Sequence, residues 1–136
     1  MESIEIFREI LIKELVTEES KKNKIDQCNA EVAAIDQELR EFQERKNKAL
    51  TEASLKGADK AQLESFRQHF DAESQHYHTS RDELLMRIDG IYNQEVGSEV
   101  VIGSVEGPYN LRIGRKLSDA TASVILLKEG VVIDIR

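Results

Sequence analysis

Apolar residues recur at intervals of three and four positions through the first half of the chain. The series is Ile25, Cys28, Val32, Ile35, Leu39 and Phe42, and Ala49 and Ala53 continue it after Lys46. This heptad spacing is typical of a helix that packs against another helix in a coiled coil. Thr17 suits the N-cap of that helix, because Glu18 and Glu19 follow it where the helix dipole favours negative charge.

A second helical pattern follows a short polar break. Its apolar positions are Leu63, Phe66, Phe70, Tyr77, Leu84, Ile88 and Ile91. Gly57 suits the position after the first helix, whereas Asp59 and Gln62 have the spacing of a capping box for the second. We therefore predict an antiparallel helical hairpin over residues 17–95, with its turn near residues 56–59.

Folding the chain back at Gly57 brings two independent patterns into agreement. The expected apolar pairs are Phe42 with Phe70, Ile35 with Tyr77, Cys28 with Leu84 and Leu85, Ile25 with Ile88, and Leu50 with Leu63. The expected ion pairs are Arg40 with Glu73 and Asp26 with Arg87. In this arrangement Cys28 is a small buried apolar residue of the helix–helix seam.

The N-terminal segment, residues 1–16, fits two periodicities. A strand would place Ile4, Ile6, Ile10, Ile12 and Val16 on one face, whereas a helix would group Ile4, Phe7, Leu11 and Leu15. The many β-branched residues favour the strand.

Glycine and the single proline concentrate after residue 90, which predicts short strands and turns in the segment 96–136. The expected strands are residues 99–105, 109–113, 123–128 and 131–135, with turns at 106–108 and 129–130. The apolar run from Val124 to Leu127 is typical of a central strand. The predicted fold class is α+β: a long antiparallel two-helix coiled-coil hairpin on a small, mainly antiparallel β-sheet or partial barrel, which the N-terminal strand joins.

Charge and composition narrow the range of functions. The net charge of −7 disfavours general binding to nucleic-acid backbones. Cys28 is the only cysteine, so an internal disulfide is excluded. Charged residues interrupt the N-terminal apolar segment, so we expect neither a signal peptide nor a membrane helix, and a cytoplasmic location.

Few residues suggest catalysis or ligand binding. His69, Glu73 and His76 share one helical face and are a candidate zinc site, but a solvated flank of the helix is the favoured interpretation. The basic clusters at 21–24 and 45–48 are interspersed with acidic residues, as on ordinary exposed helices. We find no glycine-rich phosphate loop and no nucleophile motif. We therefore assign no catalytic, cofactor or metal residue and expect no enzyme.

Several short segments resemble the YlqD-like family of bacterial proteins. They are residues 96–100, 105–107, 111–114 and 129–136, together with Leu15-Val16-Thr17-Glu18-Glu19-Ser20-Lys21 before the long helix. The resemblance implies a cytoplasmic protein without an established activity, and it transfers no catalytic residue. In some relatives the gene lies near genes for a ribosomal protein and a ribosome maturation factor. Arg115 departs from the acidic residue that often follows the glycine in relatives.

The leading functional hypothesis is a non-enzymatic scaffold or adaptor that binds an unidentified protein partner and also itself. Self-association is expected because the second helix has seam gaps at Glu73, Ser80 and Arg87, and the N-terminal strand could expose a second apolar row. That row is Phe7, Leu11 and Leu15. One alternative is an RNA- or ribosome-associated factor that uses Arg112, Arg115 and Lys116. Another is a holdase chaperone, because helical arms on a β base resemble prefoldin.

Overall fold

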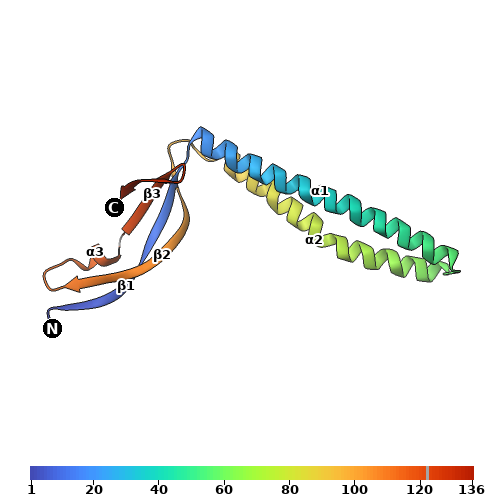
Figure 1. Ribbon diagram of the computed structural model, residues 1–136, viewed down its shortest axis with the longest axis horizontal. Coiled ribbons are helices and arrows are strands. Elements are labelled where there is room, and N and C mark those ends of the chain that lie inside the picture. Colours follow the sequence, from blue (N-terminus) through green and yellow to red (C-terminus); the bar gives the residue numbers. More distant parts are fainter. Residues whose placement is uncertain (122) are drawn as a thin grey trace. The chain divides into compact units, whose positions relative to one another are not determined.

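The computed structural model describes residues 1–121 and 123–136, which divide into two compact units (Figure 1). One unit, the sheet unit, combines residues 1–22 and 93–136, and the other, the arm, comprises residues 23–92. The elements are β1 (Ser3–Leu15), α1 (Glu18–Leu55), α2 (Lys60–Tyr92), β2 (Glu99–Arg112), α3 (Leu117–Thr121), β3 (Ser123–Lys128) and β4 (Val131–Ile135). The chain thus has the predicted α+β class, with two long helices and one open sheet.

The turn between α1 and α2 follows the predicted capping pattern. Gly57 has a φ of 87°, a left-handed conformation that suits glycine, and Ala58 N donates to Ala53 O at 3.0 Å. Asp59 Oδ1 accepts from the backbone N–H of Gln62 at 2.8 Å, and Gln62 Oε1 accepts from that of Asp59 at 3.0 Å. This reciprocal capping box satisfies donors that the start of a helix leaves unpaired, so the predicted turn at 56–59 is confirmed.

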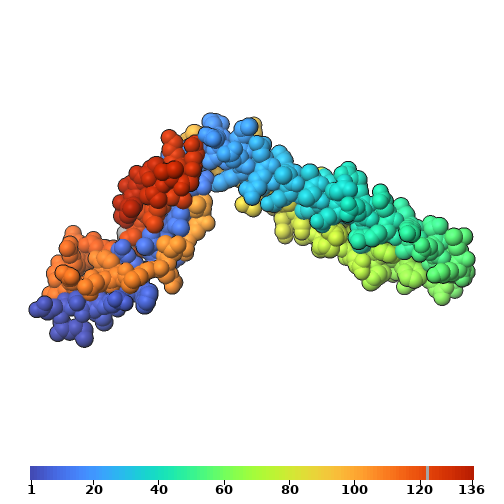
Figure 2. Space-filling view, viewed as in Figure 1, coloured from blue at the N-terminus to red at the C-terminus, as the bar shows by residue number. Residues whose placement is uncertain are grey.

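Aromatic and small apolar side chains form the seam of the arm, where α1 and α2 lie side by side (Figures 1 and 2). Cys28 and Phe42 are buried, and near the end of α2 so is Ile91. The ring centroid of Phe42 lies 5.7 Å from that of Phe70 and 5.9 Å from that of Tyr77. The predicted Phe42–Phe70 contact and the burial of Cys28 are therefore confirmed.

The ion pairs across the arm differ from those predicted. Arg40 Nη2 donates to Gln37 Oε1 at 2.9 Å and Glu73 pairs with His69, so the predicted Arg40–Glu73 pair is wrong. Two pairs that do cross the seam are Lys46 with Asp71 at 3.0 Å and Asp36 with Arg81 at 2.8 Å. Each joins α1 to a residue of α2 one helical turn beyond the position that the fold-back register places opposite. Long charged side chains reach one turn along the facing helix, so they follow a fold-back register only loosely.

The sheet has the strand order β2-β1-β3-β4. β1 pairs antiparallel with β2 and parallel with β3, whereas β3 and β4 form an antiparallel hairpin. The strand interpretation of the N-terminal segment is confirmed, and the apolar run in β3 forms an inner strand as predicted. At the β3–β4 hairpin, Glu129 and Gly130 both have positive φ, which confirms the predicted turn there.

The turn predicted at residues 106–108 is wrong, because β2 continues through it from Glu99 to Arg112. Gly107 lies opposite Arg8 and Pro108 opposite Phe7 in the pairing with β1. β2 is an edge strand, where a proline is tolerated because its missing N–H need not pair with another strand. The two strands predicted over 99–113 are therefore one, and the sheet has four strands. The short helix α3 was not predicted.

The junction between β1 and α1 is well buried. Val16 is 1% exposed, and its backbone N–H donates to Ser98 O at 2.8 Å while its carbonyl accepts from Gly97 N at 2.8 Å. Thr17 Oγ1 accepts from Ser20 N at 3.0 Å, which confirms Thr17 as the N-cap of α1. These bonds join the segment before α1 to the segment after α2.

Candidate functional site

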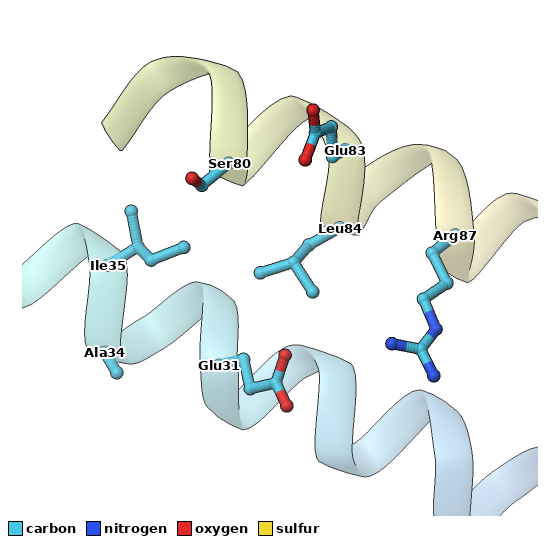
Figure 3. A pocket seen from close by; sticks show the side chains of 7 residues that line it. All are labelled: Glu31, Ala34, Ile35, Ser80, Glu83, Leu84 and Arg87. Atoms are coloured by element: carbon cyan, nitrogen blue, oxygen red, sulfur yellow. The ribbon is translucent and has the colours of Figure 1, made fainter. Parts of the chain in front are cut away.

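A groove lies along the seam of the arm, and we call it the arm groove (Figure 3). Its volume is about 510 Å³, and it is lined by Glu31, Ala34, Ile35, Ser80, Glu83, Leu84 and Arg87. Ile35 from α1 and Leu84 from α2 point into the space between the helices, and Arg87 extends from α2 toward α1 (Figure 3). The groove therefore has an apolar centre and charged side chains along its sides.

Small side chains explain why the seam is hollow here. Ser80 occupies a position where the heptad pattern of α2 would place a large apolar residue, and Ala34 lies on the facing helix. Neither side chain fills the space beside Leu84, so Ile35 and Leu84 stay only partly buried. The heptad pattern predicted the gap at Ser80. It did not indicate that Ala34 would also line the groove.

The histidine face lies farther along the same arm. His69 Nε2 lies 2.8 Å from Glu73 Oε1, and the ring of His76 stacks on Tyr77 with 3.9 Å between centroids. His76 Nδ1 lies 2.7 Å from the backbone carbonyl oxygen of Glu73. Across residues 1–121 and 123–136, no three His, Cys, Asp or Glu side chains are grouped so that they could hold a metal ion. The contacts of these histidines are those of a polar helix surface.

The basic residues predicted as an RNA contact surround the turn after β2. Arg112 ends the strand, Arg115 N donates to Arg112 O at 3.1 Å, and Gly114 between them has a φ of 91°. Arg112 and Arg115 also line a hollow of about 320 Å³, which Glu2 shares with them. The turn thus gathers positive charge, but a carboxylate lies at its side.

One face of the sheet is almost entirely apolar. Alternate residues of β1 point to the same side, and residues directly opposite one another on neighbouring strands share a face. The register therefore places one group of apolar side chains together, and we call it the isoleucine face. It consists of Ile4, Ile6, Ile10 and Ile12 of β1, Val100, Val105, Tyr109 and Leu111 of β2, Ile125 and Leu127 of β3, and Val132 and Ile135 of β4.

Arg8 and Glu14 are the charged residues of β1 on the isoleucine face. The guanidinium carbon of Arg8 lies 4.5 Å from the ring centroid of Tyr109, and Arg8 Nη1 donates to the carbonyl of Asp119 in α3 at 3.3 Å. α3 therefore covers the face around Arg8. No apolar side chain of the isoleucine face is buried: Ile4, Val132 and Ile135 are 53, 51 and 74% exposed.

The opposite face is polar over much of its area and holds a cluster of ion pairs around Arg136. Arg136 Nη1 donates to Glu99 Oε2 at 2.8 Å, and Arg136 Nε donates to Asp134 Oδ2 at 2.9 Å. The hydrogen bond from Arg136 holds the pKa of Glu99 below its usual value. Of the row predicted to be available for self-association, Phe7 is 75% and Leu11 36% exposed, whereas Leu15 is half-buried.

Comparison with known proteins identifies the fold and the family. A crystal structure of a protein of unknown function from Synechococcus sp. WH 8102 has a TM-score of 0.70 and 18% sequence identity, and the match covers 98% of this chain and 95% of that one. No protein with a curated description matches. No helix in the part of the chain that the structure describes is long and apolar enough to cross a membrane. The model of the YlqD protein family matches residues 4–136, so the chain belongs to the YlqD family.

Proposed function

We propose that the protein is a non-enzymatic, cytoplasmic adaptor whose arm groove binds a helix of a protein partner. The observation that carries this proposal is the gap in the seam at Ser80, which leaves Ile35 and Leu84 partly exposed at the centre of an elongated apolar groove. A third helix that inserts an apolar side chain there would complete the packing that two helices leave unfinished.

The charges beside the groove indicate the character of that helix. Glu31 lies on the α1 side and Glu83 on the α2 side, while Arg87 lies at one end. A partner with apolar residues at intervals of three and four, flanked by lysine or arginine, would meet both carboxylates. Exposed pairs of this kind contribute mainly to specificity and orientation, so the apolar contact supplies most of the affinity.

Photo-crosslinking tests the groove directly. A photoreactive residue at Ser80, inside the groove, is compared in cells with one at the neighbouring Thr79, which is exposed and does not line the groove. We expect position 80 to crosslink to one helical segment with the apolar and basic pattern described above, and position 79 to give little of that product. Equal yields from both positions, or a product without this pattern, would contradict the proposal.

A synthetic peptide of the captured segment then allows a matched comparison of charge. Glu83→Lys should raise its dissociation constant about tenfold, because reversing one facing charge replaces attraction with repulsion. Asp82→Lys makes the same change of charge at the adjacent exposed position, outside the groove, and should leave binding close to that of the unmodified protein. Similar losses in both variants would mean that overall charge, and not the groove, governs binding.

A holdase function is the second candidate, because apolar residues are exposed beside the turn of the arm. Leu55 is 84% and Phe66 47% exposed, and Phe66 lines a hollow of about 780 Å³ next to Gly57. Exposed apolar groups at the end of a helical arm suit weak contacts with unfolded chains. Suppression of the aggregation of a model client, lost in a Leu55→Ser/Phe66→Ser variant, would favour this function over that of an adaptor.

RNA binding rests on Arg112, Arg115 and Lys116 around a single turn. Against it stand the net charge of −7 and the neighbouring Glu2. Phosphate contacts make affinity steeply dependent on salt, so an RNA-binding titration across a salt series is decisive. Binding at low salt that an Arg112→Glu/Arg115→Glu variant abolishes would support it, and no binding at low salt would eliminate it.

A further inference from the structure

We infer that the isoleucine face is the interface of a homodimer, in which two copies of this chain pack their sheets face to face. The sheet unit supplies the first reason. Its buried apolar residues among those described are Val16, Ala120 and Leu126, and none of them belongs to the isoleucine face. An antiparallel sheet commonly packs one face on a core, whereas this sheet leaves its most apolar face without one, apart from α3.

The end of the sheet where β1 begins has the fewest paired strands. β3 pairs with residues 10–14 of β1, so over residues 3–9 the structure pairs β1 with β2 as a two-stranded ribbon. A two-stranded ribbon is marginally stable in water unless one face packs on something. Ile4 and Ile6 lie on that ribbon, with Leu111 and Tyr109 opposite them. A second sheet against the isoleucine face would support the ribbon along its length.

The size of the face suits a dimer. From a rise of about 3.3 Å per residue and a strand spacing of about 4.8 Å, the four strands give this face an area of roughly 600 Å², of which α3 covers a part. Two copies would together bury about 1,000 Å², which is the size at which specific interfaces begin. We therefore expect a dimer of moderate affinity that dissociates on dilution.

The composition of the face favours a second copy as the occupant. Its charged residues on β1 are Arg8, which α3 covers, and Glu14, so most of the remaining surface is apolar and suits a copy of itself. A two-fold axis that lies between the two sheets, perpendicular to β1 near its middle, would run the two β1 strands antiparallel. It would pack residues 3–9 of each copy against residues 9–15 of the other, which supports both ribbons.

Edge-to-edge association is the less favourable way for these sheets to meet. β2, the long edge strand, contains Pro108 and Glu106, and its register with β1 shifts beside Gly103. Proline, charge and a bulge are the features that prevent an edge from pairing with another chain. The isoleucine face has one charge of each sign on β1, and Ile4 and Ile135 on it are exposed, so association through this face is favoured over association through the β2 edge.

Light scattering of the unmodified chain and of two matched variants tests the inference. Ile4→Glu/Val105→Glu places two carboxylates on the isoleucine face, at residues that are 53 and 44% exposed. Ser3→Glu/Ser104→Glu places them at the neighbouring exposed positions on the opposite face. Circular dichroism establishes that both variants fold. All four positions are exposed within one copy, so neither variant should unfold the monomer.

In the micromolar range, we expect the unmodified chain and the serine-site variant to have twice the chain mass of 15.5 kDa. The isoleucine-face variant should have the mass of a monomer, with a dissociation constant raised at least about 100-fold, because unpaired carboxylates are costly to bury. A monomeric unmodified chain would overturn the inference and leave the face to a different protein. Dimers of equal stability in all three proteins would also overturn it, since the copies would then associate through another surface.

This inference does not rest on the proposed adaptor function. Ser80→Trp fills the arm groove and should abolish binding of the partner peptide while leaving the dimer intact. Loss of the dimer in that variant would show that the copies associate through the arm and would overturn the assignment of the isoleucine face. If the Ser80→Trp variant keeps the dimer and the Ile4→Glu/Val105→Glu variant loses it, the inference is supported even if no partner helix is found.

Discussion

Gly97 donates its backbone N–H to the carbonyl of Val16 at 2.8 Å, and it does so with a φ of 91°. This bond joins the segment before α1 to the segment that follows α2. A glycine adopts such a left-handed conformation freely, whereas any residue with a Cβ is strained there. No atom lies within 4 Å of the position that a Cβ would occupy, so space is available for a larger side chain. The junction therefore requires glycine for its backbone conformation and not for lack of space.

Gly97→Ala should lower the free energy of unfolding by about 1 to 2 kcal/mol, because alanine at positive φ is strained even where space is available. Gly90→Ala is the matched control. Gly90 lies within α2, has open space around its Cα, and has no positive φ. The same substitution should stabilise the protein there by up to about 1 kcal/mol. Urea unfolding measures both changes, and a shift of the same sign for both would contradict the argument.

Phe42 is the central side chain of the arm seam, where it lies between Phe70 and Tyr77. Phe42→Ala should destabilise the arm by about 3 kcal/mol, through lost burial and the cavity left behind. Phe66→Ala removes the same atoms from a residue that is 47% exposed and should cost much less. Thermal unfolding followed by helical circular dichroism compares the two, and equal losses would show that Phe42 is not buried in the seam.

The capping box at the turn of the arm gives a third prediction. Asp59→Ala removes the acceptor of the Gln62 N–H bond and should destabilise the protein by about 1 kcal/mol. Asp59→Ser keeps an acceptor and should recover most of that loss. Amide hydrogen exchange at the start of α2 reports the effect locally, and unchanged protection in the alanine variant would mean that the box contributes nothing.

Local chemistry made the arm predictable from sequence. Gly57, Asp59 and Gln62 specify a turn through their own backbone preferences, and the heptad series fixes which sides of the helices meet. The ion pairs were less predictable: Asp36 pairs with Arg81, one turn beyond the expected register, because a long side chain reaches over a helical turn. The arm groove could be predicted only in part, because Ser80 interrupts the heptad pattern whereas Ala34 does not.

The sheet shows where local signals fail. Gly107 and Pro108 indicate a turn when they are read alone, yet β1 is a thirteen-residue strand that holds them in β2 through pairing with Arg8 and Phe7. Pairing across a hundred residues of sequence is a tertiary effect that no local pattern contains. The alternation of Ile4, Ile6, Ile10 and Ile12 predicted an apolar face, but only the strand order shows how little of the chain's own sheet unit covers it.

The ion pair between Glu99 and Arg136 predicts a dependence of stability on acid. Hydrogen bonding to Arg136 lowers the pKa of Glu99 from its usual value of 4.5, so the folded state holds this proton less tightly than the unfolded state does. The stabilisation is therefore fully present above pH 4.5 and is lost as the pH falls through the lowered pKa. Arg136, whose pKa is raised, stays protonated throughout and adds no acid-range dependence.

Glu99→Gln, which keeps the shape of the side chain without its charge, isolates this contribution. Urea midpoints of the unmodified protein should exceed those of the variant at neutral pH, and the difference should shrink as the pH falls below 4.5. Because Arg136 is exposed and Glu99 is partly exposed, added salt should also reduce the difference at neutral pH. Glu106→Gln, at an exposed glutamate of the same strand, serves as the control. The difference between its urea midpoint and that of the unmodified protein should not shrink in the same way as the pH falls. A difference between the unmodified protein and Glu99→Gln that persists unchanged into acid would show that the carboxylate does not act through its charge.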